Sequence, residues 1–296
     1  MSDRTGEVYD LGYKPYEGPR LGRAGAIKAM LKDGLRRSFG IRRKARKKIY
    51  PWSLVTLAFL PAIVFVGLAF ALNSFVPDAE SPFGGHAQYI SLVGTVIILF
   101  VASAAPNLLI PDREDGVLSV YSSRPMTAWD YILGRVGALA GVASAFFLIP
   151  NLIMYFGLAA LDEAGLASAL IDNLDELAKV LVTMVAYVVG YGAPALLIST
   201  YAKRVGPAVG TYLAIVFISP AFAEMFKSLD FTGARFGTLI AVLQHPEIIR
   251  NWVFSESQSG MPMIAVGFEP WISVVFIALI GFVTMYLMAR RYRREL

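Results

Sequence analysis

The chain has 296 residues, of which 56% are hydrophobic and 17% are charged, and its mean hydropathy is +0.57. This composition is typical of an integral membrane protein and excludes a soluble domain of this length. The formal net charge of +5 does not indicate a nucleic-acid partner, because the excess of basic residues lies in the first 50 residues. The absence of cysteine excludes disulfides, thiolate metal sites and cysteine nucleophiles.

The first 50 residues predict a cytoplasmic head. Residues 1–23 are rich in tyrosine, glycine and proline, which indicates an extended segment, either a disordered tail or a strip that docks on a partner. Residues 24–48 predict an amphipathic helix, in which four apolar side chains recur every four residues beside a basic stripe. The apolar positions are Ile27, Leu31, Leu35 and Phe39, and the basic ones are Lys28, Lys32 and Arg36. We expect this helix to lie in the inner membrane interface, the alternative being a solvated basic arm.

Residues 51–296 form the second predicted domain, an all-α transmembrane domain with six spans. Each apolar run is long enough to cross a hydrocarbon core of ~30 Å, which needs about 20 helical residues. Because lipid offers no hydrogen-bond partners, each run must be helical to pair its own backbone groups. The runs are Trp52–Ser74, Gln88–Ile110, Tyr131–Ala160, Leu174–Thr200, Gly206–Phe226 and Pro270–Ala289.

The distribution of basic residues predicts the orientation. Nearly all of the 27 lysines and arginines lie in the head, in the connections after the second and fourth spans, and in the C-terminal tail. The positive-inside rule therefore places both termini in the cytoplasm, with anionic membrane lipid as an expected contact. We expect a multi-pass protein of the cell membrane, most simply a prokaryotic plasma membrane.

The last outer connection, Lys227–Glu269, is unusually apolar for a loop. Its apolar stretches are too short to span, so we expect re-entrant material that dips into the outer leaflet before span six, covered by protein. Glu224 lies just before this connection. It is either half of a local pair with Lys227 or a polar gate facing a transport path. Lys179 follows Asp175 by four residues and predicts a helix ion pair.

No catalytic set is apparent, so we expect a protein that is not an enzyme. The only histidines, His86 and His245, lie far apart in outer connections, which excludes an H-E-x-x-H zinc site. We assign both of them ordinary polar or capping roles.

The connection after the second span has the most specific sequence. Four charged residues end the span, and Val117, Leu118, Val120 and Tyr121 then form an apolar face. Pro125 ends any helix at or before Arg124. This pattern predicts a short helix at the inner membrane surface that could insert into a groove of a soluble partner. An ordinary charged loop is the alternative.

This stretch resembles the first cytoplasmic loop of the ABC-2 family of ATP-binding-cassette transporter permeases. The matching positions are Asp112, Glu114, Asp115, Gly116, Arg124, Pro125, Leu133, Gly134 and Arg135, where arginine replaces the more common lysine. The head segment Tyr13-Lys14-Pro15-Tyr16-Glu17-Gly18-Pro19-Arg20 is also similar to openings of some of these permeases. The six-span topology with an interfacial helix and re-entrant material extends the resemblance over the whole chain.

The resemblance implies a transport subunit, most simply of an exporter, without its own ATPase. The sequence agrees, because it contains no G-x-x-x-x-G-K-[ST] phosphate loop. ATP and Mg²⁺ would bind in a partner ATPase subunit, with no cofactor in this chain, and a second permease chain would complete the unit. The implied coupling residues are Asp112, Arg113, Glu114, Asp115, Gly116, Leu118, Tyr121, Arg124 and Pro125. The main alternative, a secondary transporter or channel-like protein that needs no ATPase, would place paired ionisable residues in mid-span, where they are nearly absent.

Overall fold

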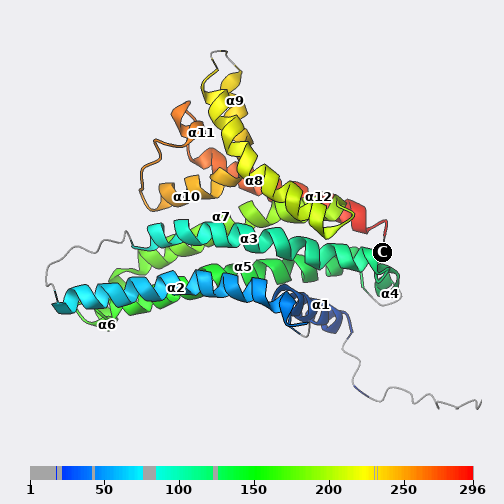
Figure 1. Cartoon of the computed structure of the whole chain (residues 1–296), viewed down its shortest axis with the longest axis horizontal. Coiled ribbons are helices and arrows are strands. Elements are labelled where there is room, and N and C mark those ends of the chain that lie inside the picture. Colours follow the sequence, from blue (N-terminus) through cyan, green and yellow to red (C-terminus); the bar gives the residue numbers. More distant parts are fainter. Residues whose placement is uncertain are drawn as a thin grey trace, which may run out of the picture.

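The computed structural model describes residues 18, 22–41, 44–75, 85–122, 126–229, 231 and 233–295, and within these ranges it contains helices and no strands. Six helices are long and apolar enough to cross a membrane, as predicted (Figure 1). They are α2 (Arg46–Phe75), α3 (Gly85–Glu114), α5 (Ala128–Ala159), α7 (Leu174–Tyr201), α8 (Val205–Lys227) and α12 (Trp271–Tyr292). The chain is thus a multi-pass membrane protein, whereas the cytoplasmic placement of its termini stays a prediction.

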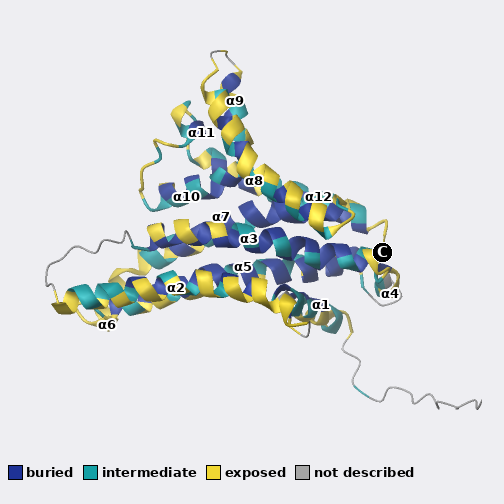
Figure 2. Ribbon diagram, in the orientation of Figure 1, coloured by how far each residue is buried: buried dark blue, intermediate teal, exposed yellow. Residues whose placement is uncertain are grey.

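Helices α3, α5 and α7 form the centre of the bundle, and α2, α8 and α12 lie around them (Figure 2). The most apolar window of α3 is 72% buried, against 17% for α8. Tyrosine hydroxyls join two of the outer helices, α2 and α8, to the centre: Tyr89 donates to the Ala58 carbonyl at 2.9 Å, and Tyr212 donates to the Tyr191 carbonyl at 3.2 Å. Outer helices with exposed apolar faces are expected where lipid is the solvent.

The two ends of the bundle carry the functional candidates. At one end, α3 leads through the short helix α4 (Leu118–Ser122) into α5, and α1 (Gly22–Ser38) and the C-terminus lie beside it (Figure 1). We name this the α4 end. At the other end, α5 leads through α6 (Leu166–Asp172) into α7, and we name it the α6 end.

Helix α1 is shorter than the predicted helix over residues 24–48, because the chain turns at Gly40, which has a positive φ of 63°. A helix that lay only on the membrane surface would contact lipid alone, whereas α1 also packs against another helix. Met30 and Gly34 are buried against α5, where Gly134 faces Met30 and Ala138 faces Gly34. Glycines at these contacts let the two helix backbones approach closely.

We expect Gly34→Ala to destabilise the protein by about 1–3 kcal/mol, because the added Cβ would lie 2.5 Å from the Cβ of Ala138 and neither carbon can rotate away. The matched control is Gly141→Ala on α5, where a Cβ would have no neighbour within 4 Å. Thermal unfolding in detergent should show a lower midpoint for the first variant only. Equal midpoints for the two variants would contradict the close packing of α1 on α5.

The connection between α8 and α12 folds back along the bundle. It contains α9 (Ala234–Gly237), two 3₁₀ turns (Thr238–Ile240 and Val242–Gln244), α10 (His245–Val253) and α11 (Pro262–Ala265). Helix α10 packs against α7 and α12, with Pro246 on Gly190, in the middle of α7, and with Phe254 near Lys179, in the first turns of α7. The segment therefore reaches the middle of the bundle and returns to the α6 end. This arrangement suits the predicted re-entrant segment, which stays a prediction.

His245 begins α10 in a buried polar pocket. Its Nδ1 lies 2.9 Å from the Ser273 hydroxyl and its Nε2 lies 3.3 Å from the Leu239 carbonyl, so Nε2 carries the hydrogen and Nδ1 accepts one from Ser273. Burial lowers the pKa of His245 to about 4, which keeps the ring neutral. The residue thus joins the first 3₁₀ turn, Thr238–Ile240, to α12, in agreement with the polar role predicted for it.

Candidate functional site

The candidate site at the α4 end begins where α3 terminates. The chain reverses at Gly116, whose φ of 65° is easily adopted by glycine, and α4 follows at Leu118. Helix α5 then starts after Thr127, whose hydroxyl and backbone N–H pair with Asp130 in a capping box. Both ends of this connection are therefore fixed by local structure.

Helix α4 directs its larger apolar side chains towards the bundle. Leu118 is buried in the core, and the Tyr121 ring lies 6.1 Å from the ring of Tyr131 on α5. Val120 is 51% exposed, and Glu114 and Asp115 are also exposed. Among the described residues around α4, Val120 is therefore the apolar side chain left exposed, near two acids, rather than the whole predicted apolar face.

A buried ion pair lies directly beneath α4. Arg135 on α5 donates to Asp112 at the end of α3 through Nε at 3.0 Å and Nη2 at 2.7 Å, and both side chains have no exposed surface. The Tyr131 hydroxyl donates to the same Asp112 oxygen at 3.0 Å, and Arg37 donates to the other oxygen at 2.7 Å. A carboxylate with all of these donors satisfies its lone pairs, which offsets part of the cost of removing it from water.

The same network reaches α1. Asp33 accepts from Arg135 at 2.9 Å and from Arg37, four residues further along α1, at 2.8 Å. At the start of α1, Arg23 forms a further ion pair with Asp130 at 2.8 Å, which raises the pKa of the guanidinium. Charged groups thus join α1, the end of α3 and the start of α5 at one point, so that these three helix ends are expected to move together.

Arg113 connects the same region to α7. Its guanidinium donates to the carbonyls of Ser199 at 2.5 Å and Ala202 at 2.8 Å, and also to that of Thr200. These carbonyls belong to the end of α7, where helix geometry leaves them without an intrahelical partner. The residue therefore caps α7 and ties it to the end of α3.

The structure separates the predicted coupling residues into two groups. Asp112, Arg113, Leu118 and Tyr121 face inward and hold α4 on the bundle, whereas Glu114 and Asp115 face outward. Gly116 forms the turn, and Arg124 and Pro125 lie outside the described residues. The sequence-based set omitted Asp33, Arg37, Tyr131 and Arg135 as site residues. The four-residue spacing of Asp33 and Arg37 was the available signal for an ionic face on α1.

Two ion-paired groups near the ends of the spans are formed by residues three or four positions apart on one helix. Lys179 contacts Asp175 at 2.9 Å, which confirms the predicted helix pair, and it also contacts Glu176 at 2.7 Å. Glu224, the candidate gate, lies in the last turn of α8 and pairs with Lys227 at 2.5 Å. This ion pair is the first of the two roles expected for Glu224, whereas a role of Glu224 as a gate stays a prediction.

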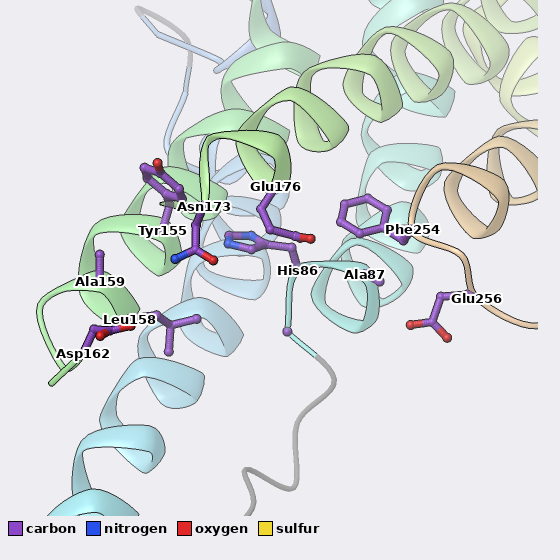
Figure 3. Close-up of a pocket in the computed structure, with 11 residues that line it drawn as sticks. His86, Ala87, Tyr155, Leu158, Ala159, Asp162, Asn173, Glu176, Phe254 and Glu256 are labelled. Atoms are coloured by element: carbon purple, nitrogen blue, oxygen red, sulfur yellow. The ribbon is translucent and has the colours of Figure 1, made fainter. Parts of the chain in front are cut away.

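A cavity of about 420 Å³ lies at the α6 end, between the starts of α3 and α7 and the ends of α5 and α10 (Figure 3). His86 lies on its wall and is 8% exposed, with Nδ1 3.0 Å from the Asn151 side-chain oxygen. Glu176 and Glu256 also line the cavity. Across the described ranges, no group of three His, Cys, Asp or Glu side chains is placed to hold a metal ion.

No protein-family model and no curated protein matches this chain. In chemical terms, the α4 end presents the exposed carboxylates of Glu114 and Asp115 beside a short helix that packs on the bundle. A short helix packed on three joined helix ends can transmit a displacement of its outer surface to the bundle.

Proposed function

We propose that the chain is the membrane-spanning permease subunit of an ABC-2-type transporter, most simply an exporter of the prokaryotic plasma membrane. In this proposal both termini and the α4 end face the cytoplasm, α1 lies at the inner membrane surface, and α10 is the re-entrant segment. A separate ATPase subunit supplies the energy, and α4 is the coupling helix. Two permease chains and two ATPase subunits form the working transporter.

The observation that carries the proposal is the attachment of α4. This helix is anchored from within by Leu118 and Tyr121, and it lies directly above the buried pair of Asp112 and Arg135. A displacement applied to its outer surface would pass to α3, α5 and α1 instead of being absorbed by a flexible loop. Ordinary charged loops that only connect two spans have no need for such an anchor.

The mechanism follows from this connection. ATP binding closes the ATPase pair, which displaces α4 through its exposed surface around Glu114, Asp115 and Val120. Because Arg113 joins the end of α3 to the end of α7, the displacement also reaches the third helix of the centre. The central helices then tilt as a unit relative to the outer ones, which opens a path on the other side of the membrane.

The secondary-transporter alternative is disfavoured by the positions of the charges. Among the described residues of the six spans, charged side chains lie in the terminal turns, and the deepest is Arg135, two turns into α5. An ion-coupled carrier needs ionisable groups near the middle of its helices. An external energy source agrees better with this distribution.

The proposal is tested with purified protein. The chain alone in lipid nanodiscs should show no ATPase activity, and a nucleotide-binding polypeptide should co-purify with it from its native membrane. Adding that polypeptide should produce ATP hydrolysis and, in vesicles, ATP-dependent movement of cargo. Uphill transport by the chain alone, or recovery of the chain without any ATPase under mild solubilisation, would overturn the proposal.

A further inference from the structure

A groove on the bundle surface has the shape and chemistry of a lipid-chain site. It lies between α5, α7 and α12 and encloses about 320 Å³. Its walls are almost entirely apolar, and small side chains such as Ala140, Gly192 and Ala278 make it deep. Phe282, which is 70% exposed, forms one rim.

The groove continues into a basic cavity at the α4 end. This cavity encloses about 600 Å³ and shares Phe282 and Met285 with the groove. Its far wall carries two interfacial aromatic residues, Trp129 and Tyr286, and three arginines. The arginines are Arg290, Arg293 and Arg294.

These three arginines differ from the neighbouring Arg291 in their ion pairing. Within the part of the chain that the structure describes, no carboxylate forms an ion pair with any of them, whereas the neighbouring Arg291 pairs with Glu295 at 2.9 Å. The Arg293 guanidinium lies 6.0 Å from the centre of the Trp129 ring. Clustered arginines beside indole and phenol rings at the end of a membrane helix are suited to phosphate groups at the membrane surface.

The combined length of the groove and the basic cavity matches the thickness of one bilayer leaflet. The stretch from Ala278 on α12 to Arg293, the helical residue that caps it, is about 22 Å long at 1.5 Å per residue. One acyl chain needs about 15 Å, half of the hydrocarbon core, and the remaining length reaches the headgroup region. The side chains of Ala278, Phe282, Met285, Ala289 and Arg293 follow one another at spacings of three or four residues, so they form one continuous face of α12.

We propose that this face binds an anionic glycerophospholipid, with one acyl chain in the groove and its phosphate headgroup on Arg290, Arg293 and Arg294. The charge of the cavity and the apolar character of the groove select this occupant over a zwitterionic lipid or a peptide. The inference requires only that the chain spans a membrane. It is independent of the transport proposal, so either one can fail while the other stands.

The test uses the full chain in detergent, titrated with phosphatidylglycerol or with phosphatidylcholine of identical acyl chains, and native mass spectrometry to measure bound lipid. Phosphatidylglycerol should bind at least tenfold more tightly. Replacing the three arginines by Gln should lower its affinity about 100-fold, because each basic residue near an anionic surface contributes about fivefold. The matched control removes three exposed charges elsewhere, by Lys44→Gln, Lys203→Gln and Arg204→Gln, and should bind nearly as wild type.

A second variant tests the groove. Ala278→Phe fills it without changing any charge and should lower phosphatidylglycerol binding at least tenfold, whereas Ala221→Phe on the exposed face of α8 should have no effect. Equal affinity for the two lipids, or an equal loss in the charge control, would overturn the proposal. Displacement of the lipid by inorganic phosphate, together with normal binding to Ala278→Phe, would show a headgroup-only site and would also overturn it.

Discussion

Replacing Arg135 by Met is expected to lower the free energy of unfolding by about 3 kcal/mol or more, because it leaves the fully buried Asp112 carboxylate with one fewer charged partner. Arg37 and Tyr131 still donate to Asp112, so the chain should remain folded. The measurement is the urea or thermal unfolding midpoint in detergent. Lys32→Met, which removes an exposed positive charge from α1, should change the midpoint little.

The double variant Asp112→Asn/Arg135→Met separates the pair from the individual residues. Removing both charges eliminates the uncompensated carboxylate, so the double variant should recover a large part of the loss caused by Arg135→Met alone. If the loss of the double variant equalled the sum of the losses of Asp112→Asn and Arg135→Met measured separately, Asp112 and Arg135 would not be energetically coupled. In that event the joint between α3 and α5, on which the coupling mechanism depends, would have no support.

Replacing Glu114 and Asp115 together by Ala should reduce ATP-driven transport at least about tenfold, which corresponds to about 1.4 kcal/mol of lost interaction with the ATPase. Both side chains are exposed, so stability and membrane insertion should stay within about 0.5 kcal/mol of the wild-type values. Hydrolysis and transport are measured in the same vesicles. We expect hydrolysis to continue while transport is lost, because the motor is no longer joined to the bundle.

The control for this uncoupling is Glu163→Ala/Glu269→Ala, which removes two exposed acids from other connections of the chain. It should transport as wild type, because these residues do not belong to the surface around α4. Wild-type transport by the Glu114→Ala/Asp115→Ala variant would remove the coupling assignment. A third substitution, Val120→Ala, should give an intermediate loss if the apolar side chain enters the same groove.

The six spans could be predicted from the sequence because each follows from local properties. A run of about 20 apolar residues must be helical in lipid whatever it packs against. The short helix at Leu118 was predictable for a similar reason, since charges before it and a proline after it bound it on both sides. Its orientation was not predictable. The apolar periodicity of Leu118, Val120 and Tyr121 shows that a face exists but not whether the bundle or a partner covers it.

The sequence by itself determined that this protein resides in a lipid bilayer, how many spans it has and that it contains no phosphate loop. These properties depend on composition and on contiguous residues. The tertiary structure alone decided that Asp112 pairs with Arg135 and Arg37, that α1 lies against α5, and that an apolar groove continues into a cavity lined by Arg290, Arg293 and Arg294. Each of these features brings together residues that are distant in the chain. Their meeting depends on how helices pack, which contiguous sequence patterns do not specify.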